Sequence, residues 1–470
     1  MDGLSNDRMV RILEAGLCAV ILIAPLPFGA VLPLGRTGLE LAAAILLVLW
    51  LARALLRPEP GPGRGVIVSL VGMLALVLLQ AVPLGAPLAG TVSPNVIAAR
   101  QAGIPTGEAL AAESRLLDTP PSSLEPGARL SLAPDSTVSA LRTGAALAAL
   151  LLVACTVGRE LGLRRLAWAM ALSAGFQGTH GALVLLSGHD QIWHIPKRYF
   201  LDCATGTFVN RGHFAIFVVA CLAPAAAMAL SVSAPAVRGG KRLAYWFGPR
   251  GGRNMLLRIL VLLGAAGLLL SFSRHGTALG LLVLAWVWFR SENSGGKRRF
   301  MIPALLLILV AVPLLRFDPG RLADRYTRTA ESLTDEAGRR TAWSDSLGII
   351  RDYPVAGTGL GTFSQVYPSY RSPEIRRFFD HLHNDLLQWI VETGFIGLLL
   401  LLPLAWNVAR RTAAAVGGRF GATAVGFGAG LAAIVLYSMF DFPFHLPAIA
   451  ALAAILAGAL LGIPCPQTTD

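Results

Sequence analysis

Long apolar runs separated by short polar loops dominate the chain. Runs such as Leu39 to Leu51, Val66 to Leu79 and Ile390 to Leu404 hold almost no charged residue. A membrane-spanning helix needs about 20 mostly apolar residues, and these runs reach that length with their flanks. The pattern predicts twelve spans, at approximately residues 12–32, 38–56, 66–84, 138–157, 166–187, 208–231, 255–272, 275–290, 300–316, 383–406, 421–440 and 445–462.

Composition strengthens this interpretation. Of the 470 residues, 54% are hydrophobic and only 14% are charged, whereas a soluble domain carries about 25% charged residues. The sequence contains no internal repeat and no separate soluble stretch. We therefore predict an all-α, polytopic membrane protein in which residues 1–470 form a single integral membrane domain.

The basic residues indicate orientation and not nucleic-acid binding. The net charge is +13, but the arginines and lysines are spread over short alternate loops and do not gather on one domain. Arg53, Arg57 and Arg64 follow the second span, whereas Arg36 alone lies between the first two. The positive-inside rule then makes the basic side cytoplasmic, and an even number of spans places both termini there.

Two longer segments fall on the opposite, outer side. One covers residues 85–137 and the other residues 317–382. In the second, Trp343, Leu347 and Ile350 recur at helical spacing and predict one face of an amphipathic helix. Pro354 follows and predicts that this helix ends, because the residue before a proline disfavours helical geometry.

Polar residues at membrane depth are costly, so they are candidates for function. On the predicted topology they gather on the outer side, in four separate pieces of chain. Arginine can bind phosphate oxygens in pairs, and histidine can accept a proton from a hydroxyl. No carboxylate pair suits a metal-bound pyrophosphate, so we predict no metal and no cofactor. The four pieces are Asn210-Arg211-Gly212-His213, Ser273-Arg274-His275, His381-Leu382-His383-Asn384-Asp385 and Asp441 with His445.

Simpler interpretations stand beside these. His383 can merely help to begin a helix that Asn384 or Asp385 caps, and Arg274 can be a headgroup anchor. Glu392 lies about half a turn around the helix from His383, which favours a structural role. A tight turn is a better interpretation of Gly357 to Gly361 than a phosphate loop. For Tyr367 and Tyr370, packing within the loop is favoured over stacking on a sugar.

These motifs resemble those of the O-antigen ligase and polymerase superfamily. The most specific is His383-Asn384, followed by Glu392-Thr-Gly394-Phe-Ile-Gly397. The resemblance extends over about residues 206–450. The other similar elements are Gly206-Thr-Phe-Val-Asn210-Arg211-Gly-His213, Ser271-Phe-Ser273-Arg274, Arg339 with Trp343, Pro354 with Gly357 to Phe363, and Asp441-Phe-Pro-Phe-His445-Leu-Pro447-Ala. Gly212 and His275 depart from the family, which often has Asn and Gly there.

The resemblance implies a GT-C-like helical fold in the bacterial inner membrane and a periplasmic active site. It implies an undecaprenyl-pyrophosphate-linked glycan as donor, and lipid A-core or another glycan as acceptor, within a lipid bilayer. His383 is then the base. Arg211, Arg274 and Arg339 are the phosphate-binding candidates, and Asn210, His213 and Asn384 complete the predicted substrate site.

Other functions remain open at this point. A polysaccharide polymerase or a protein O-oligosaccharyltransferase would share the transfer motifs. A lipid-linked glycan transporter belongs to a different class, and it would place its polar residues at the bilayer midplane in two related halves. A structural scaffold would leave the arginines and histidines of the outer side unexplained.

Overall fold

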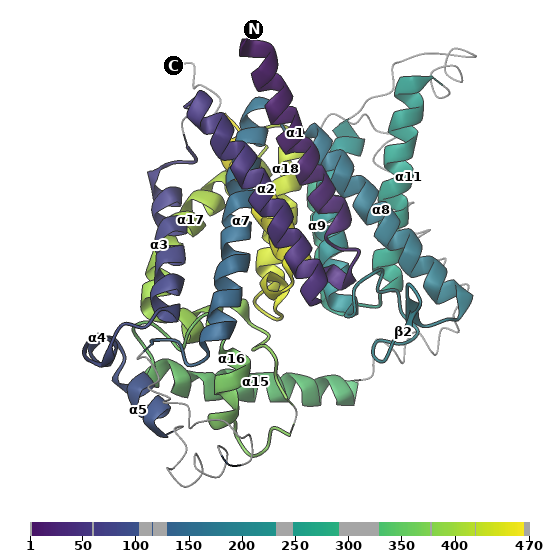
Figure 1. Ribbon diagram of the computed structural model, residues 1–470. Coiled ribbons are helices and arrows are strands. Elements are labelled where there is room, and N and C mark those ends of the chain that lie inside the picture. The colour runs from purple at the N-terminus through teal and green to yellow at the C-terminus, as the bar shows by residue number, and fades with distance from the viewer. Residues whose placement is uncertain are drawn as a thin grey trace. The chain divides into compact units, whose positions relative to one another are not determined.

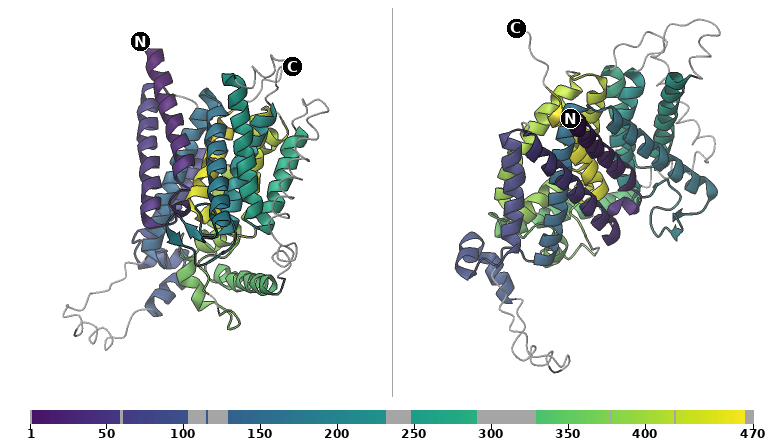
Figure 2. Two further views of the ribbon diagram at one scale, coloured as in Figure 1. Left: turned by 90° about the vertical axis from the view of Figure 1, so that its right-hand side faces the viewer. Right: turned by 45° about the horizontal axis from the view of Figure 1, so that its top comes forward.

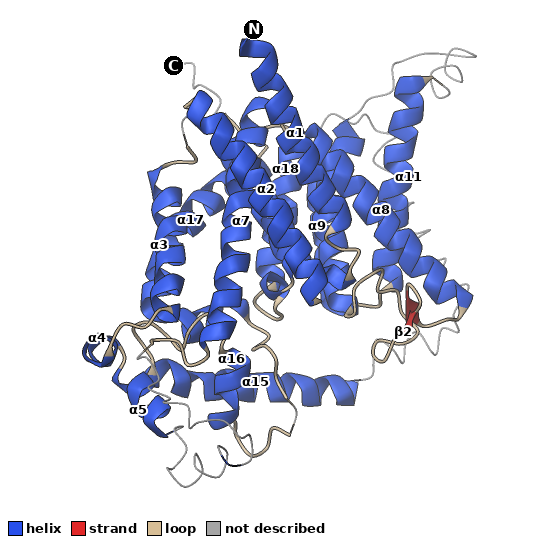
Figure 3. Cartoon of the chain, viewed as in Figure 1, coloured by secondary structure: helices blue, strands red, loops and turns tan. Residues whose placement is uncertain are grey.

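The computed structural model describes residues 2–58, 61–102, 115, 129–231, 248–290, 329–376, 378–418 and 420–464. Helices dominate this part of the chain (Figure 3). A short antiparallel pair, β1 (Gln191–Ile192) with β2 (Ile195–Pro196), is the one sheet within the described ranges. The all-α prediction is therefore confirmed.

Eleven of the predicted spans coincide with helices, and the ninth, residues 300–316, lies outside the described residues. Among the described residues, seven helices are long and apolar enough to cross a membrane: α2, α3, α7, α8, α9, α11 and α17. The protein is thus a polytopic helical membrane protein, and the count of twelve stays a prediction. The helices at the predicted spans are α1 (Asp2–Ile23), α2 (Pro33–Leu56), α3 (Arg64–Ala81), α7 (Pro134–Glu160), α8 (Arg164–Ser187), α9 (Arg211–Ser231), α11 (Pro249–Leu270), α12 (Arg274–Arg290), α17 (Asp385–Val416), α18 (Ala422–Tyr437) and α19 (Pro447–Gly462).

The chain forms two compact units. The first comprises Met1–Arg64, Ala146–Ser332 and Ala405–Asp470, and the second comprises Gly65–Ala145 and Leu333–Leu404. The first unit is a helical bundle around α9, which packs against α8, α11, α12 and α18 (Figure 1, Figure 2). Small residues bring these helices close together, because a Cβ atom at Gly426 or Gly430 of α18 would collide with the backbone of α9.

The outer helices of the first unit expose apolar side chains. In α2, only 22% of the most apolar stretch is buried. Leu34, Leu41, Val48 and Leu55 are all exposed along it. A soluble protein rarely exposes so continuous an apolar surface, so this face suits the hydrocarbon of a bilayer.

The second unit joins α3 to the polar segment around α15 (Thr329–Asp352). Its core contains Ile349, Phe363, Tyr367 and Leu382. Part of the predicted outer loop 85–137 packs here as well, through α4 (Ala86–Val92) and α5 (Pro94–Ala102), with Val96 in the core. The amide of Leu132 also donates to the carbonyl of Thr358 at 2.9 Å. The shorter elements of this unit are α16 (Phe363–Val366) and η2 (Tyr367–Ser369).

The amphipathic helix is confirmed, but its buried face is rotated from the prediction. Ala342, Ser346 and Ile349 are fully buried, whereas Leu347 is 59% exposed. Trp343 and Ile350 pack at the edge of the core. Small side chains let the helix approach its neighbours closely, which hydrophobic spacing alone does not reveal. The helix ends at Asp352, just before Tyr353 and Pro354, as predicted.

The predicted span 383–406 contains a break. Gly394 has φ 62° and ψ −167°, which separates a short first helix from the apolar remainder of α17. The two amides after the break remain satisfied, since Phe395 N donates to Pro354 O at 2.8 Å and Ile396 N to Val355 O at 3.2 Å. Broken helices are tolerated in membrane proteins where such partners exist.

Candidate functional site

His383 lies in a short loop that is hydrogen-bonded to both α15 and α17. Its neighbour Leu382 is fully buried, and the Leu382 amide donates to Gln388 Oε1 at 2.9 Å. The Leu382 carbonyl accepts a hydrogen bond from the Trp343 indole, also at 2.9 Å. His383 itself has φ 55°, a conformation that non-glycine residues adopt rarely and that is often found at functional sites. The half-buried imidazole thus projects from a backbone of defined geometry.

Asn384 caps the helix that follows. Its Oδ1 accepts the amide of Leu387 at 3.0 Å, three residues on, which is the usual geometry of an asparagine N-cap. The capping role expected for Asn384 or Asp385 is therefore confirmed for Asn384. His383 stands directly before the cap and outside the helix.

A buried polar chain supports this loop. Gln388 also bonds His381 Nδ1 at 3.2 Å and Glu392 Oε1 at 3.0 Å. The Glu392 carboxylate, 1% exposed, accepts the amides of Gly361 at 2.9 Å and Phe363 at 3.1 Å. The structural role expected for Glu392 is confirmed.

The Gly357–Gly361 segment is a turn wrapped around this carboxylate, which also confirms the sequence interpretation. Gly357, Gly359 and Gly361 all have positive φ. The amides of Gly361 and Phe363 do form an anion-binding concavity, but the anion is the protein's own Glu392. A motif that resembles a phosphate loop therefore serves to position α17.

Sequence reasoning missed Gln80. This fully buried side chain of α3 donates to the carbonyls of Ala356 (2.7 Å) and Glu392 (2.9 Å) and accepts the amide of Leu360 (3.1 Å). Gln80 therefore links α3 to the Gly357–Gly361 turn and to the backbone of α17 at Glu392. The available signal was a lone glutamine in an otherwise apolar span.

Aromatic rings form one wall beside His383. Phe379 meets the His383 ring edge to face at 6.0 Å, and it meets Tyr367 in the same way. Tyr367 is 1% exposed and donates to Asp345 Oδ2 at 3.0 Å. Burial, and then the bond to Asp345, raises the Tyr367 pKa well above its usual value. Tyr370 likewise packs on this core and donates to Asp352 at 2.6 Å. Loop packing is thus confirmed for both tyrosines.

Arg339 belongs to the same unit. It lies on α15 one helical turn before Trp343 and is half-buried. Because Trp343 bonds the residue next to His383, the structure brings Arg339, His383 and Asn384 into one neighbourhood. The other predicted site residues lie in the first unit.

Asn210 and Arg211 begin α9. Asn210 Oδ1 accepts the amide of Gly212 at 2.7 Å, so Asn210 caps this helix. The Arg211 guanidinium lies 5.8 Å from the centre of the Phe200 ring, in a cation–π contact.

His213 of α9, two positions after Arg211, is buried. Its Nε2 lies 3.6 Å from Asp441 Oδ1, and its ring packs edge to face on Phe442. Asp441 also accepts the Tyr437 hydroxyl at 3.0 Å. His213 thus has buried contacts within the protein, and its role in substrate binding stays a prediction.

Arg274 is the exposed first residue of α12. The preceding Ser273 Oγ accepts the amide of Gly276 at 3.3 Å and caps the helix. His275 stacks on Phe440 at 6.1 Å. The structure therefore brings together three of the predicted polar pieces, around Arg211, Arg274 and Asp441, at one end of the first unit. The His383 piece lies in the second unit.

Fold and site together define a polytopic helical membrane protein with arginine and histidine residues at fixed helix starts. Residues 259–402 match the family described as O-antigen ligase, and this match confirms the resemblance to the O-antigen ligase superfamily. It includes Arg274, Arg339, His383 and Asn384, whereas Asn210, Arg211 and His213 lie outside it. No curated protein matches the chain.

Proposed function

We propose that the protein is a membrane glycosyltransferase that moves a glycan from undecaprenyl pyrophosphate to an acceptor hydroxyl at the periplasmic face of the inner membrane. The observation that carries this proposal is the fixed backbone next to His383. The amide and the carbonyl of the neighbouring Leu382 are both hydrogen-bonded. A base that must reach a hydroxyl proton requires such fixed geometry. We infer lipid A-core as the acceptor, as in a ligase.

In the proposed reaction, His383 accepts the proton of the acceptor hydroxyl. The oxygen forms a bond to the anomeric carbon of the donor sugar, and the bond from that carbon to pyrophosphate breaks. Arg211, Arg274 and Arg339 stabilise the negative charge that develops on the leaving group. Among the described residues, no carboxylate forms an ion pair with Arg211 or Arg274, so both charges are available to an anion.

The test measures glycan transfer by purified protein with lipid-linked donor, lipid A-core and a chelator. His383→Asn is the informative variant, because asparagine tolerates positive φ better than alanine and therefore keeps the loop conformation. We expect it to be folded and to lose transfer by at least about a hundredfold, the usual contribution of a general base. His194→Asn is the matched control and should keep most of the activity, because His194 is an exposed histidine outside the predicted site.

Each alternative has its own outcome. If His383→Asn transfers glycan at the normal rate, the histidine only begins a helix and the mechanism is wrong. Activity with a second lipid-linked repeat unit or with a serine-containing peptide, but not with lipid A-core, would instead indicate a polymerase or a protein O-oligosaccharyltransferase. Movement of donor across a vesicle bilayer without transfer would indicate a transporter. Loss of wild-type activity with chelator would exclude the metal-free mechanism.

A further inference from the structure

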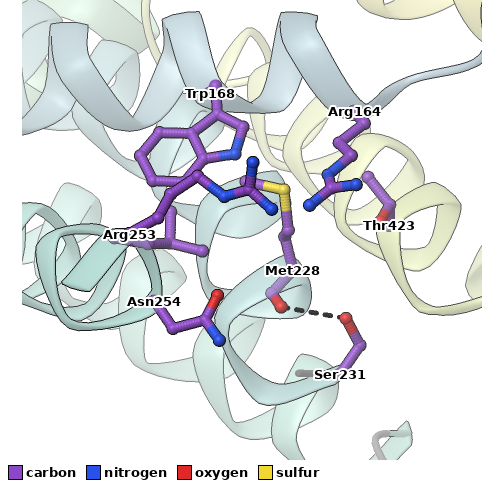
Figure 4. Close-up of a pocket in the computed structure, with 8 residues that line it drawn as sticks. Arg164, Trp168, Met228, Ser231, Arg253, Asn254 and Thr423 are labelled. Atoms are coloured by element: carbon purple, nitrogen blue, oxygen red, sulfur yellow. Dashed lines mark hydrogen bonds between the residues drawn. The ribbon is translucent and has the colours of Figure 1, made fainter. Parts of the chain in front are cut away.

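A cavity lies in the first unit at the end of α9 opposite to Arg211. It measures about 310 Å³. Its lining residues are Met228 and Ser231 of α9, Arg164 and Trp168 of α8, Arg253, Asn254 and Leu257 of α11, and Thr423 of α18 (Figure 4). None of these residues belongs to the predicted transfer site.

Two arginines from different helices point into this space. Figure 4 shows the guanidinium groups of Arg164 and Arg253 directed toward one another, beside Trp168. Within the described ranges no carboxylate forms an ion pair with either of them. By contrast, the neighbouring Arg165 pairs with Glu14 at 2.7 Å. Two cations that face each other across a cavity repel, and an anion between them would remove that repulsion.

The helices around the cavity add partial positive charge. Arg164 is the first residue of α8, and Thr423 is the second residue of α18. Neither helix start has a side-chain cap, so first-turn amides are open to another acceptor. The side chain of Thr423 supplies a further donor.

We propose that this cavity binds a phosphate group, with Arg164 and Arg253 as its two principal ligands. A planar guanidinium matches phosphate oxygens in pairs, and helix starts suit the same anion. The phosphate can belong to the headgroup of an anionic phospholipid in the leaflet predicted to be cytoplasmic, or to a soluble phosphate compound. The binding site is separate from the proposed transfer reaction and does not depend on it.

The experiment measures thermal unfolding of the full chain in detergent, in two arms. One arm titrates inorganic phosphate against chloride at equal ionic strength, and the other titrates short-chain phosphatidylglycerol against phosphatidylcholine. The variants are Arg164→Gln and Arg253→Gln. Arg250→Gln is the matched control, because Arg250 is an exposed arginine of α11 that does not line the cavity.

We expect a saturable rise in melting temperature for the wild type and for Arg250→Gln. Each cavity variant should bind about tenfold more weakly or worse, as expected for the loss of a charge-assisted hydrogen bond. A response to inorganic phosphate would indicate a soluble ligand, and a response to phosphatidylglycerol alone would indicate a lipid headgroup. The proposal is wrong if the wild type responds in neither arm, or if Arg250→Gln weakens binding as much as the cavity variants.

Both cavity side chains are exposed, so we expect the single variants to fold. Arg164→Lys gives a second measurement that does not change net charge. Lysine keeps the positive charge but loses the planar fork, so its affinity should lie between those of the wild type and Arg164→Gln. Equal binding by the lysine variant and the wild type would contradict paired recognition by this arginine.

Discussion

The predicted base and the predicted phosphate ligands are held in different ways. His383 follows a residue whose amide and carbonyl are both bonded, and a buried chain through Gln388 and Glu392 supports it. Arg211 and Arg274 each begin a helix, and a polar residue just before each of them caps that helix. His383 is thus positioned by the hydrogen bonds of the backbone next to it. The positions of Arg211 and Arg274 are instead set by the starts of α9 and α12.

The difference corresponds to what each group would do. A base needs a narrow range of distance and angle to one proton. An arginine acts over a longer range and can adjust its long side chain to the ligand. Mutations in the polar chain should therefore disturb the second unit broadly, and mutations at the helix starts of the first unit should have smaller effects.

The largest effect is expected for Glu392→Ala. Its buried carboxylate accepts two backbone amides and the Gln388 side chain. Removal leaves three donors without an acceptor and should cost at least about 3 kcal/mol of stability. Thermal unfolding in detergent measures this cost. Glu374→Ala is the control, since it removes an exposed carboxylate from the same unit; an equal loss in both variants would contradict the structural role of Glu392.

Gln80→Leu should follow, with a loss of about 2–3 kcal/mol. The leucine keeps most of the volume but leaves Leu360 N and Ala356 O without their partner, and Glu392 O keeps only the amide of Gly359. Transfer activity should fall as well, because the Gly357–Gly361 turn becomes less rigid, and this turn holds the Glu392 carboxylate that supports the His383 loop. The matched control is Gln365→Leu, since Gln365 is exposed and bonds only Ser136 in the described contacts. If the Gln80→Leu protein is as stable as this control, Gln80 does not stabilise the contact between α3 and the Gly357–Gly361 turn.

Gly212→Ala tests the first unit. A Cβ atom there would collide with the Tyr437 hydroxyl, which donates to Asp441. We expect a loss of about 1–3 kcal/mol from overpacking. Tyr437→Phe removes the obstructing oxygen, so the double variant should be more stable than the two separate losses imply. Additive losses would show that the two positions do not interact.

Much of this fold was predictable because membrane spans carry a strong signal. Helix starts and caps such as Asn384 were also predictable, because the residue types that cap helices are characteristic. The rotation of α15 was not predictable, because Ala342 and Ser346 are buried by close approach and not by hydrophobicity. The contact of His213 with Asp441 joins residues far apart in sequence, and a sequence alone contains no distance between them.

The smallest loss of stability is expected at the two asparagine caps, Asn384 beside His383 and Asn210 beside Arg211. Asn384→Ala and Asn210→Ala should each cost about 1 kcal/mol, whereas aspartate at either position should preserve the cap. If Asn384 also binds substrate, Asn384→Asp should melt like the wild type and yet transfer glycan more slowly, because a new negative charge would oppose an anionic donor. If it is only a cap, Asn384→Asp should keep both stability and activity. Asn210→Asp separates the same two roles beside Arg211, and the pair of variants shows which asparagine, if either, acts beyond its helix.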